Sequence, residues 1–236
     1  MRNIFFIVGT GRSGTNLCQQ LLDLHPGIKA VTETHFIRTL VRHFPDVQLS
    51  PSEFFEVIAD HFMSDGQKRW VDFHIEKCRV SSRLFKTTFI KNAEKAGAKT
   101  SAELVKVFFQ TCYGNGDYLL GDKTPFYGLH APEMLKLFPN AKFIHLIRDG
   151  RFAATSMQKH PGFVKLINAD FPNAVDEYAY KGVQSNFPTN DVSLEQCILF
   201  WENVVSKTRE SCEQIPRSQY LEAVSYTHLT LPTNGC

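Results

Sequence analysis

The chain has 236 residues, a length that suits one α/β domain with a substantial core. A hydrophobic fraction of 43% and a charged fraction of 21% are usual for globular proteins and exclude the disordered and fibrous classes. The formal net charge is only +2 and the basic residues form no long run, so we expect no nucleic-acid partner.

The chain opens with the pattern of a strand, a glycine-rich turn and a helix. Residues 4–8 are apolar, glycines follow at Gly9, Gly11 and Gly14, and leucines at helical spacing begin at Leu17. Such a turn directs backbone N–H groups and a helix N-terminus at one place, where an anion is favoured. The sequence therefore predicts a phosphate or sulfate site, although a turn that only packs a helix on a strand has the same pattern.

This loop has nearly the spacing of the phosphate loop G-x-x-x-x-G-K-[ST], but its chemistry differs. Thr15 stands where the lysine would be, Asn16 stands where the magnesium-binding hydroxyl would be, and a cation, Arg12, lies inside the loop. A loop without that lysine and hydroxyl is poorly equipped to transfer a γ-phosphate. It suits an anion that needs no metal, such as a sulfuryl group.

A second extended segment ends near Val31 and is followed by Glu33 and His35. Ligands of open α/β sheets bind outside the carboxyl ends of the strands, so both residues are candidates for the site. The alternative is ordinary helix capping by Thr32 or Thr34, with Glu33 in the first turn. The next helix is expected at residues 35–43.

Three helices are expected between residues 50 and 114. The first has a capping box at Ser50 and Glu53, and its aromatic stripe is expected in the core. The second covers residues 80–96 and is basic and amphipathic. The third starts near Lys99 and ends at Gly114.

The next predicted strand, residues 118–120, leads into the segment GDKTP. Lys123 in this segment follows the strand closely and is well placed to face the anion site, although an exposed loop lysine is the alternative. A helix is expected after it at residues 130–138.

The strand predicted at residues 142–147 (KFIHLI) leads directly to Arg148 and then to a helix that carries Ser156. A triphosphatase would have a metal-binding aspartate at the end of this strand. A guanidinium there, with Ser156 nearby, instead predicts a second phosphate site. Asp149 is expected to cap the helix.

The last part of the chain changes character twice. Residues 160–190 are rich in Pro, Asn and Gly, and we expect an irregular segment on the acceptor side of the site. A helix begins at the capping box of Ser193, and a strand begins at Gln219. From residue 223 the chain has no helical period and almost no charge, so we assign the domain to residues 1–222, truncated at its C-terminal end, and interpret residues 223–236 as a non-native tail.

Two further expectations concern location and metals. The apolar run at residues 4–8 is too short for a signal-peptide core or a membrane span, so we expect a cytoplasmic protein without a membrane span. The six cysteines include no C-x-x-C pair, so no zinc site or redox pair is predicted.

Three motifs in this order, GTGRSGTN, GDKTP and IRDGRFAATS, resemble those of the sulfotransferase family, which takes sulfate from 3′-phosphoadenosine-5′-phosphosulfate (PAPS). The resemblance is closest to the tyrosylprotein sulfotransferase branch and its bacterial relatives. It covers residues 4–37 and 118–157 well and residues 194–221 weakly. It implies a P-loop-like three-layer α/β fold with a central, mostly parallel sheet flanked by helices. It also implies an enzyme that uses PAPS as a co-substrate, needs no metal and acts on an acceptor hydroxyl.

The resemblance further implies which residues bind PAPS. The loop for the 5′-phosphosulfate corresponds to Gly11, Arg12, Ser13, Gly14, Thr15 and Asn16. The pair for the 3′-phosphate corresponds to Arg148 and Ser156.

The resemblance implies three catalytic residues. Glu33 corresponds to the general base, Lys123 to the lysine that steadies the sulfuryl group and its leaving oxygen, and Arg12 to a cation at the same group. The branch has two acidic residues before a threonine and a basic residue after it, whereas this chain has Thr32, Glu33, Thr34 and His35. This departure puts recognition of a peptide acceptor in question, and His35 is the alternative base.

Two other functions remain open at this point. A P-loop kinase or other nucleotide triphosphatase would have the same loop spacing, but the lysine and the metal-binding aspartate are missing. A non-catalytic PAPS-binding protein would have the same anion sites. A tyrosine, a sugar hydroxyl and a small alcohol or phenol all remain candidates for the acceptor.

Overall fold

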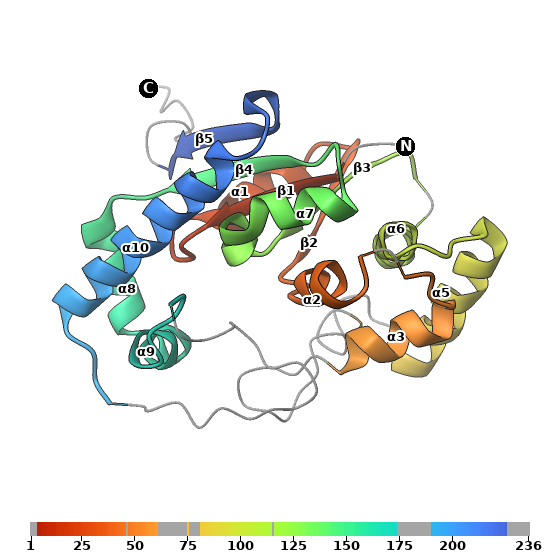
Figure 1. Cartoon of the computed structure of the whole chain (residues 1–236), viewed down its shortest axis with the longest axis horizontal. Helices are drawn as coiled ribbons and strands as arrows, with labels where there is room; N and C mark the ends of the chain where they lie inside the picture. The colour runs from red at the N-terminus through yellow and green to blue at the C-terminus, as the bar shows by residue number, and fades with distance from the viewer. Residues whose placement is uncertain are drawn as a thin grey trace, which may run out of the picture.

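A computed structural model describes most of the chain, and a parallel five-stranded sheet forms its centre (Figure 1). The described residues are 4–45, 47–60, 75, 81–114, 116–173 and 190–225. The sheet has the order β2-β3-β1-β4-β5, and its neighbouring strands are all parallel. The strands are β1 (Ile4–Gly9), β2 (Ile28–Thr32), β3 (Leu119–Lys123), β4 (Lys142–Ile147) and β5 (Tyr220–Val224). The α/β fold class predicted from the sequence is confirmed.

The strand register brings the ends of four strands to one edge of the sheet. Ile7 of β1 pairs with Lys123 at the end of β3, and Thr32 at the end of β2 pairs with the same lysine. Gly9 at the end of β1 pairs with Leu146 near the end of β4. The segments that follow these strands therefore start side by side, as expected for a site at the carboxyl edge of a parallel sheet.

Helices cover both faces of the sheet, as Figure 1 shows with α1 on one side and α7 and α10 on the other. Helix α1 (Thr15–Asp23) packs Cys18 with Phe5 and Ile7 of β1. The alternate residue Phe6 faces the other side, towards the helices α7 and α10. This side holds the short 3-10 helix η1 (Pro125–His130), α7 (Ala131–Leu137) and α10 (Leu194–Glu213).

Four helices form an aromatic core beyond the β2 end of the sheet. Phe36, Phe54, Phe89 and Phe108 come from four different helices, and neighbouring rings lie 5.4–6.4 Å apart. The capping boxes at Ser50 and Thr100 are present. The aromatic stripe of α3 is buried in the core, as expected. These helices are α2 (Phe36–His43), α3 (Pro51–Ala59), α5 (Ser82–Ala96) and α6 (Ser101–Tyr113).

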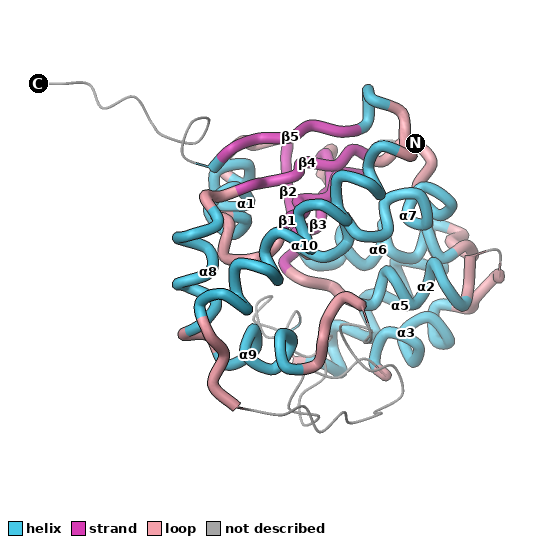
Figure 2. The backbone as a smooth tube through the Cα atoms, turned by 60° about the vertical axis from the view of Figure 1, so that its left-hand side comes forward, coloured by secondary structure: helices cyan, strands magenta, loops and turns pink. Residues whose placement is uncertain are grey.

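Helices α8 and α9 lie at the opposite end from α3 and α5 (Figures 1 and 2). Helix α8 (Gly150–Gln158) follows β4 and is capped by the Asp149 side chain, which accepts from the N–H of Arg151, as predicted. Helix α9 (Pro161–Asn168) corrects the expectation of an irregular segment at residues 160–190. Proline at the first helical position and packing of Leu166 against the cluster around Phe126 stabilise this helix. Residues 174–189 of that segment lie outside the described part.

The end of the described chain forms the edge of the sheet. Strand β5 pairs Val224 with Ile147 of β4, so it includes two residues beyond the domain end assigned at residue 222. Ser225 is buried next to Gly14. Residues 226–236 of the predicted tail lie outside the described part. Within the described residues, no helix has the length and apolarity of a membrane span.

Candidate active site

The glycine-rich loop between β1 and α1 is held in shape by its own buried hydroxyls. The Oγ atoms of Thr10 and Ser13 lie 2.7 Å apart, and both hydroxyls contact the carbonyl oxygen of Gly11. Gly11 (φ 68°) and Gly14 (φ 85°) have left-handed conformations that glycine adopts without strain. The Ser13 hydroxyl is therefore engaged inside the loop, and an anion bound there would meet backbone N–H groups and the first turn of α1.

Two arginines and a serine meet beside this loop. Arg12 donates from Nε to Ser156 Oγ at 2.9 Å, and Arg148 donates from Nη1 to the carbonyl oxygen of Arg12 at 3.1 Å. The Arg148 guanidinium also lies 5.7 Å from the centre of the Phe152 ring. The two guanidiniums are therefore on the same side of the sheet. The sequence predicted Arg12 at one anion site and Arg148 and Ser156 at another. In the structure, Arg148 and Ser156 both form hydrogen bonds with Arg12.

Glu33, the predicted base, forms an ion pair with Lys123. The Lys123 side chain is fully buried, whereas the Glu33 side chain is 32% exposed. Burial alone would raise the pKa of Glu33, but the nearby His35 ring and the charge of Lys123 hold this pKa well below its ordinary value. Glu33 is therefore a carboxylate at neutral pH, with its uncovered part available for a ligand.

The backbone around Glu33 is strained and firmly held. Glu33 (φ 54°) and His35 (φ 50°) both have left-handed conformations, which cost free energy in residues other than glycine. The Glu33 N–H donates to the Lys123 carbonyl oxygen at 2.8 Å. Between the two, Thr34 Oγ1 lies 2.9 Å from the Tyr127 hydroxyl, which also accepts from the N–H of Ile37 at 3.1 Å. His35 Nε2 lies 4.0 Å from Glu33 Oε2.

Asp122 is a buried carboxyl that the sequence did not single out. It precedes Lys123 on β3, it is fully buried, and Thr124 Oγ1 donates to its Oδ1 at 2.5 Å. Burial raises the pKa of Asp122 to about 6. The motif GDKTP contained the signal, because an acidic residue on a buried central strand must have polar partners.

A cavity of about 300 Å³ joins the loop to Glu33. Its lining includes the predicted residues Gly11, Arg12, Thr15, Asn16 and Glu33, together with His35. Lys123, Arg148 and Ser156 are absent from this lining; Lys123 lies behind Glu33. The opposite wall comes from η1 and α9 and consists of Pro125, Phe126, His160, Gly162, Phe163, Lys165 and Leu166.

The residues of α9 in this wall are those that sequence reasoning missed. The sequence contained a signal for this helix, because Pro161 is a residue type favoured at the first position of a helix and His160 precedes it as the N-cap. The desolvation of His160 and the charge of Arg12 lower the pKa of this histidine, whereas the charge of Glu33 opposes the shift. His160 is therefore close enough to Arg12 and Glu33 for their charges to affect its pKa.

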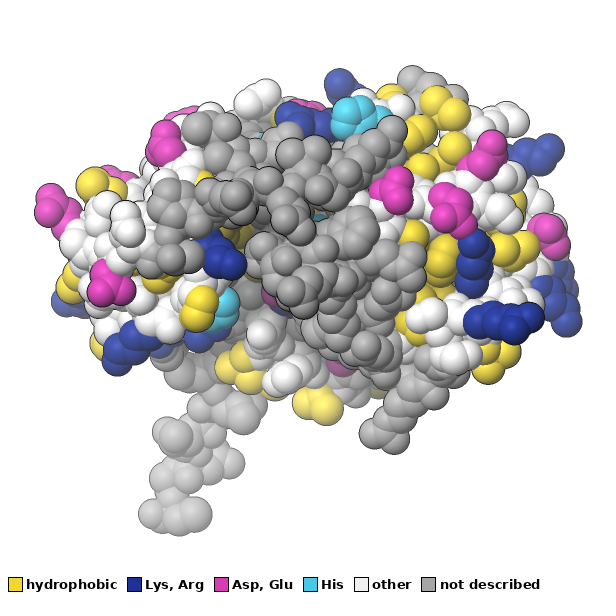
Figure 3. Space-filling view, turned by 90° about the horizontal axis from the view of Figure 1, so that it is seen from below, with side chains coloured by type: hydrophobic (Ala, Val, Ile, Leu, Met, Phe, Trp, Pro, Cys, Tyr) yellow, Lys and Arg dark blue, Asp and Glu magenta, His cyan; other side chains and the backbone are white. Residues whose placement is uncertain are grey.

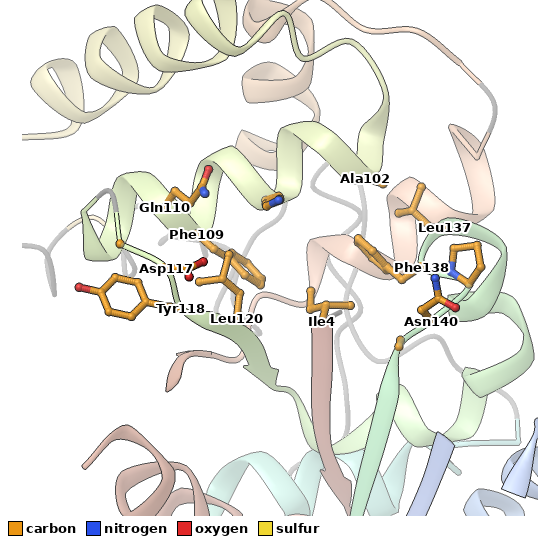
Figure 4. A pocket seen from close by; sticks show the side chains of 14 residues that line it. Ile4, Ala102, Phe109, Gln110, Asp117, Tyr118, Leu120, Leu137, Phe138 and Asn140 are labelled. Atoms are coloured by element: carbon orange, nitrogen blue, oxygen red, sulfur yellow. The ribbon is translucent and has the colours of Figure 1, made fainter. Parts of the chain in front are cut away.

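A second cavity, of about 190 Å³, lies at the opposite edge of the sheet, where the strands begin (Figure 4). Its walls include Ile4, Phe109, Tyr118, Leu120 and Phe138, and none of the predicted site residues lines it.

In the space-filling view of the face seen from below, Lys and Arg side chains lie at the periphery, mixed with acidic and apolar ones (Figure 3). Within the described chain, no cluster of three or more His, Cys, Asp or Glu residues could hold a metal ion.

Relatives named as protein-tyrosine sulfotransferases are similar to this chain. Protein-tyrosine sulfotransferase A of Caenorhabditis elegans is 25% identical over 228 residues, which are 96% of this chain and 45% of that protein. Protein-tyrosine sulfotransferase 1 of Mus musculus is 27% identical over 154 residues, which are 65% of this chain and 33% of that protein. The chain thus spans less than half the length of these relatives.

Solved structures support the same fold. The sulfotransferase domain from the curacin biosynthetic pathway has a TM-score of 0.57 at 14% identity and covers 95% of this chain and 68% of its own. The sulfotransferase domain of a Synechococcus olefin synthase has a TM-score of 0.52 at 17% identity, with the same two coverages of 95% and 68%. A family model described as "Sulfotransferase family" matches residues 5–233. This chain therefore belongs to the sulfotransferase family.

Proposed function

We propose that this protein transfers a sulfuryl group from PAPS to an acceptor hydroxyl, with Glu33 as general base. The observation that carries the proposal is the position of Arg12. Its side chain contacts Ser156 on α8, and it also lines the cavity that contains Glu33. A cationic loop and a carboxylate thereby border one cavity.

The residues around the loop suit the two anionic ends of PAPS. The 5′-phosphosulfate would bind to the loop and to the first turn of α1, where helix N–H groups have no acceptor within the helix. The 3′-phosphate would bind to Arg148 and Ser156, because a guanidinium offers a fork of donors to phosphate oxygens. The residues proposed for the loop site are Gly11, Arg12, Ser13, Gly14, Thr15 and Asn16.

The proposed reaction is an in-line displacement at sulfur. The acceptor oxygen forms a bond to sulfur as Glu33 takes its proton, and the bond from sulfur to the 5′-phosphate oxygen breaks. The products are a sulfate ester and 3′-phosphoadenosine 5′-phosphate, which leaves with the bonding electron pair. Arg12 offsets the negative charge that builds up on the departing phosphate.

Lys123 has two successive roles in this proposal. It contacts Glu33, and its charge keeps the base ionised. To steady the leaving oxygen its ammonium has to turn from Glu33 towards the loop. That movement removes a positive charge from the base and makes Glu33 a stronger proton acceptor at the moment when a proton is transferred.

The cavity favours an acceptor with a flat aromatic ring. Phe126 and Phe163 supply aromatic walls, with ring centres 6.3 Å apart, and Glu33 lies in the same lining. Aromatic walls with a few polar groups are typical of sites for ring-bearing ligands. We therefore favour a phenolic hydroxyl, and the names of the two curated relatives, which mention protein tyrosine, agree with that choice.

The test is transfer of radiolabelled sulfate from PAPS to tyrosine peptides, small phenols, alcohols and glycans. Wild type should label a phenolic acceptor, and Glu33→Gln should lower turnover about 10²- to 10⁴-fold while binding of 3′-phosphoadenosine 5′-phosphate changes little. Glu56→Gln is the matched control, because Glu56 is an exposed glutamate that pairs with Lys86 on the surface. Full turnover by Glu33→Gln would reject this base and make His35 the next residue to test.

Two other results would reject the reaction itself. Binding of PAPS without transfer to any acceptor would identify a binding protein. Magnesium-dependent hydrolysis of ATP would identify a nucleotide triphosphatase. Labelling of glycans or small alcohols in place of phenols would keep the reaction and correct the acceptor class.

A further inference from the structure

His160 is fixed at the wall of the cavity that faces the phosphate loop. It precedes α9, and its side chain caps this helix by accepting from the N–H of Gly162 through Nδ1 at 3.1 Å. The same ring lines the cavity together with Arg12 and Glu33. One ring nitrogen of His160 is thus engaged with the backbone, and the residue borders the proposed site.

The capping bond determines which nitrogen carries the proton. Nδ1 accepts a hydrogen bond, so in the neutral ring the proton is on Nε2, which is then a donor. Burial and the charge of Arg12 both lower the pKa of His160, and a contact with its own backbone and the carboxylate of Glu33 oppose this shift only in part. His35 and Lys165 are the other titratable groups in the cavity lining. The ring therefore remains neutral at pH 7 and presents Nε2–H.

Phe163 fits α9 against the phosphate loop. Its ring meets the His160 ring edge to face, with centres 5.5 Å apart and an interplanar angle of 77°. A Cβ atom at Gly11 would lie 2.6 Å from Cζ of Phe163, so the loop and the helix are in close contact at this point. The distance from His160 to the loop is thus set by packing and does not depend on a flexible segment.

We propose that His160 donates a hydrogen bond from Nε2–H to a sulfuryl oxygen of the donor, on the side of the sulfur that faces α9. This inference rests on the proposed function and adds a second protein group, besides Arg12, at the transferred sulfuryl group. His160 cannot be the general base in this arrangement, because its one lone pair is used by the Gly162 N–H.

A sulfuryl oxygen is a better partner for Nε2–H than the acceptor oxygen. The acceptor oxygen gives its proton to Glu33 and needs its lone pair for the new bond to sulfur. A hydrogen bond donated to that lone pair would weaken the nucleophile. Sulfuryl oxygens only accept, and a donor that is already in position stabilises them without reorganisation.

Two substitutions separate this role from helix capping. His160→Asn retains a capping side chain, because asparagine is a good N-cap, but it is too short to present the Nε2 donor. His160→Gln retains an N–H donor at similar reach. We expect His160→Asn to lower the turnover number about 10- to 100-fold, with an unchanged melting temperature and an affinity for 3′-phosphoadenosine 5′-phosphate within about twofold of wild type. His160→Gln should recover a large part of the lost turnover.

A binding measurement tests the contact without any acceptor. PAPS contains the sulfuryl group and 3′-phosphoadenosine 5′-phosphate does not, so only PAPS should shift the Nε2 resonance of His160 in ¹⁵N NMR. His160→Asn should likewise weaken PAPS but not the product nucleotide. Full turnover by His160→Asn, or equal NMR shifts with both nucleotides, would overturn the inference while leaving the proposed function intact. Absence of binding of either nucleotide to wild type would overturn the proposed function itself.

Discussion

The ion pair between Glu33 and Lys123 should make a larger contribution to stability through its lysine than through its carboxylate. Lys123 is fully buried, whereas the Glu33 side chain is 32% exposed. Glu33→Gln therefore leaves an ammonium in the interior without the carboxylate it contacts, a change that costs about 3 kcal/mol of unfolding free energy. Lys123→Met leaves a carboxylate that water can still reach, and we expect a cost of about 1–2 kcal/mol.

Thermal and urea unfolding check this asymmetry. For a chain of 236 residues, a loss of about 3 kcal/mol lowers the melting temperature by about 6–12 °C. The double variant Glu33→Gln/Lys123→Met should recover to within about 1 kcal/mol of wild type, because no unpaired charge of this ion pair remains.

The surface offers a matched pair as the control. Lys86 and Glu56 are also in close contact, but their side chains are 38% and 65% exposed. Removing that carboxylate with Glu56→Gln should cost less than about 1 kcal/mol. If Glu33→Gln cost no more than Glu56→Gln, the reasoning from burial would be refuted. The expected destabilisation also means that turnover of Glu33→Gln must be measured well below its melting temperature.

Two further predictions concern ligand binding and pH. Arg148→Ala should weaken binding of 3′-phosphoadenosine 5′-phosphate about 10- to 100-fold in calorimetry, because it removes a charge-assisted contact; equal affinities would reject the 3′-phosphate site. Burial raises the pKa of Asp122 from 3.8 to about 6, so protonation of this group favours the folded state as the pH falls. Burial lowers the pKa of His145 from 6.5 to about 4, so protonation of this group favours the unfolded state as the pH falls. In urea unfolding, Asp122→Asn should therefore lose about 2 kcal/mol more than wild type between pH 7 and pH 4; parallel profiles would contradict the assignment to Asp122.

The candidate residues whose positions could be predicted from the sequence are those that follow the ends of strands. Apolar runs mark the strands, and parallel strands bring their carboxyl ends to one edge. Arg12, Glu33 and Arg148 each follow such a run within a few residues, so their shared location needed only the fold class. Local sequence patterns were sufficient here because the sheet itself supplies the long-range geometry.

Contacts between elements could not be predicted in the same way. The ion pair of Glu33 with Lys123 depends on the register that places Thr32 beside Lys123, and no pattern in either strand defines that register. Helix α9 was missed because it lies at the start of a longer segment, residues 160–190, that is rich in Pro, Asn and Gly. Its short apolar face is stabilised by packing of Leu166 near Phe126, a tertiary interaction that outweighs weak local propensity.

The contacts of Arg12 link the two ends of the donor in the proposed reaction. Its guanidinium contacts Ser156, and its carbonyl oxygen accepts from Arg148, so both groups assigned to the 3′-phosphate already engage the loop arginine. In the proposed reaction, a 3′-phosphate bound to Arg148 and Ser156 would compete with these contacts and would free the Arg12 side chain from Ser156. Binding energy from the remote end of PAPS would then be used to place a cation at the reacting centre, which is how an enzyme favours the transition state over the bound substrate.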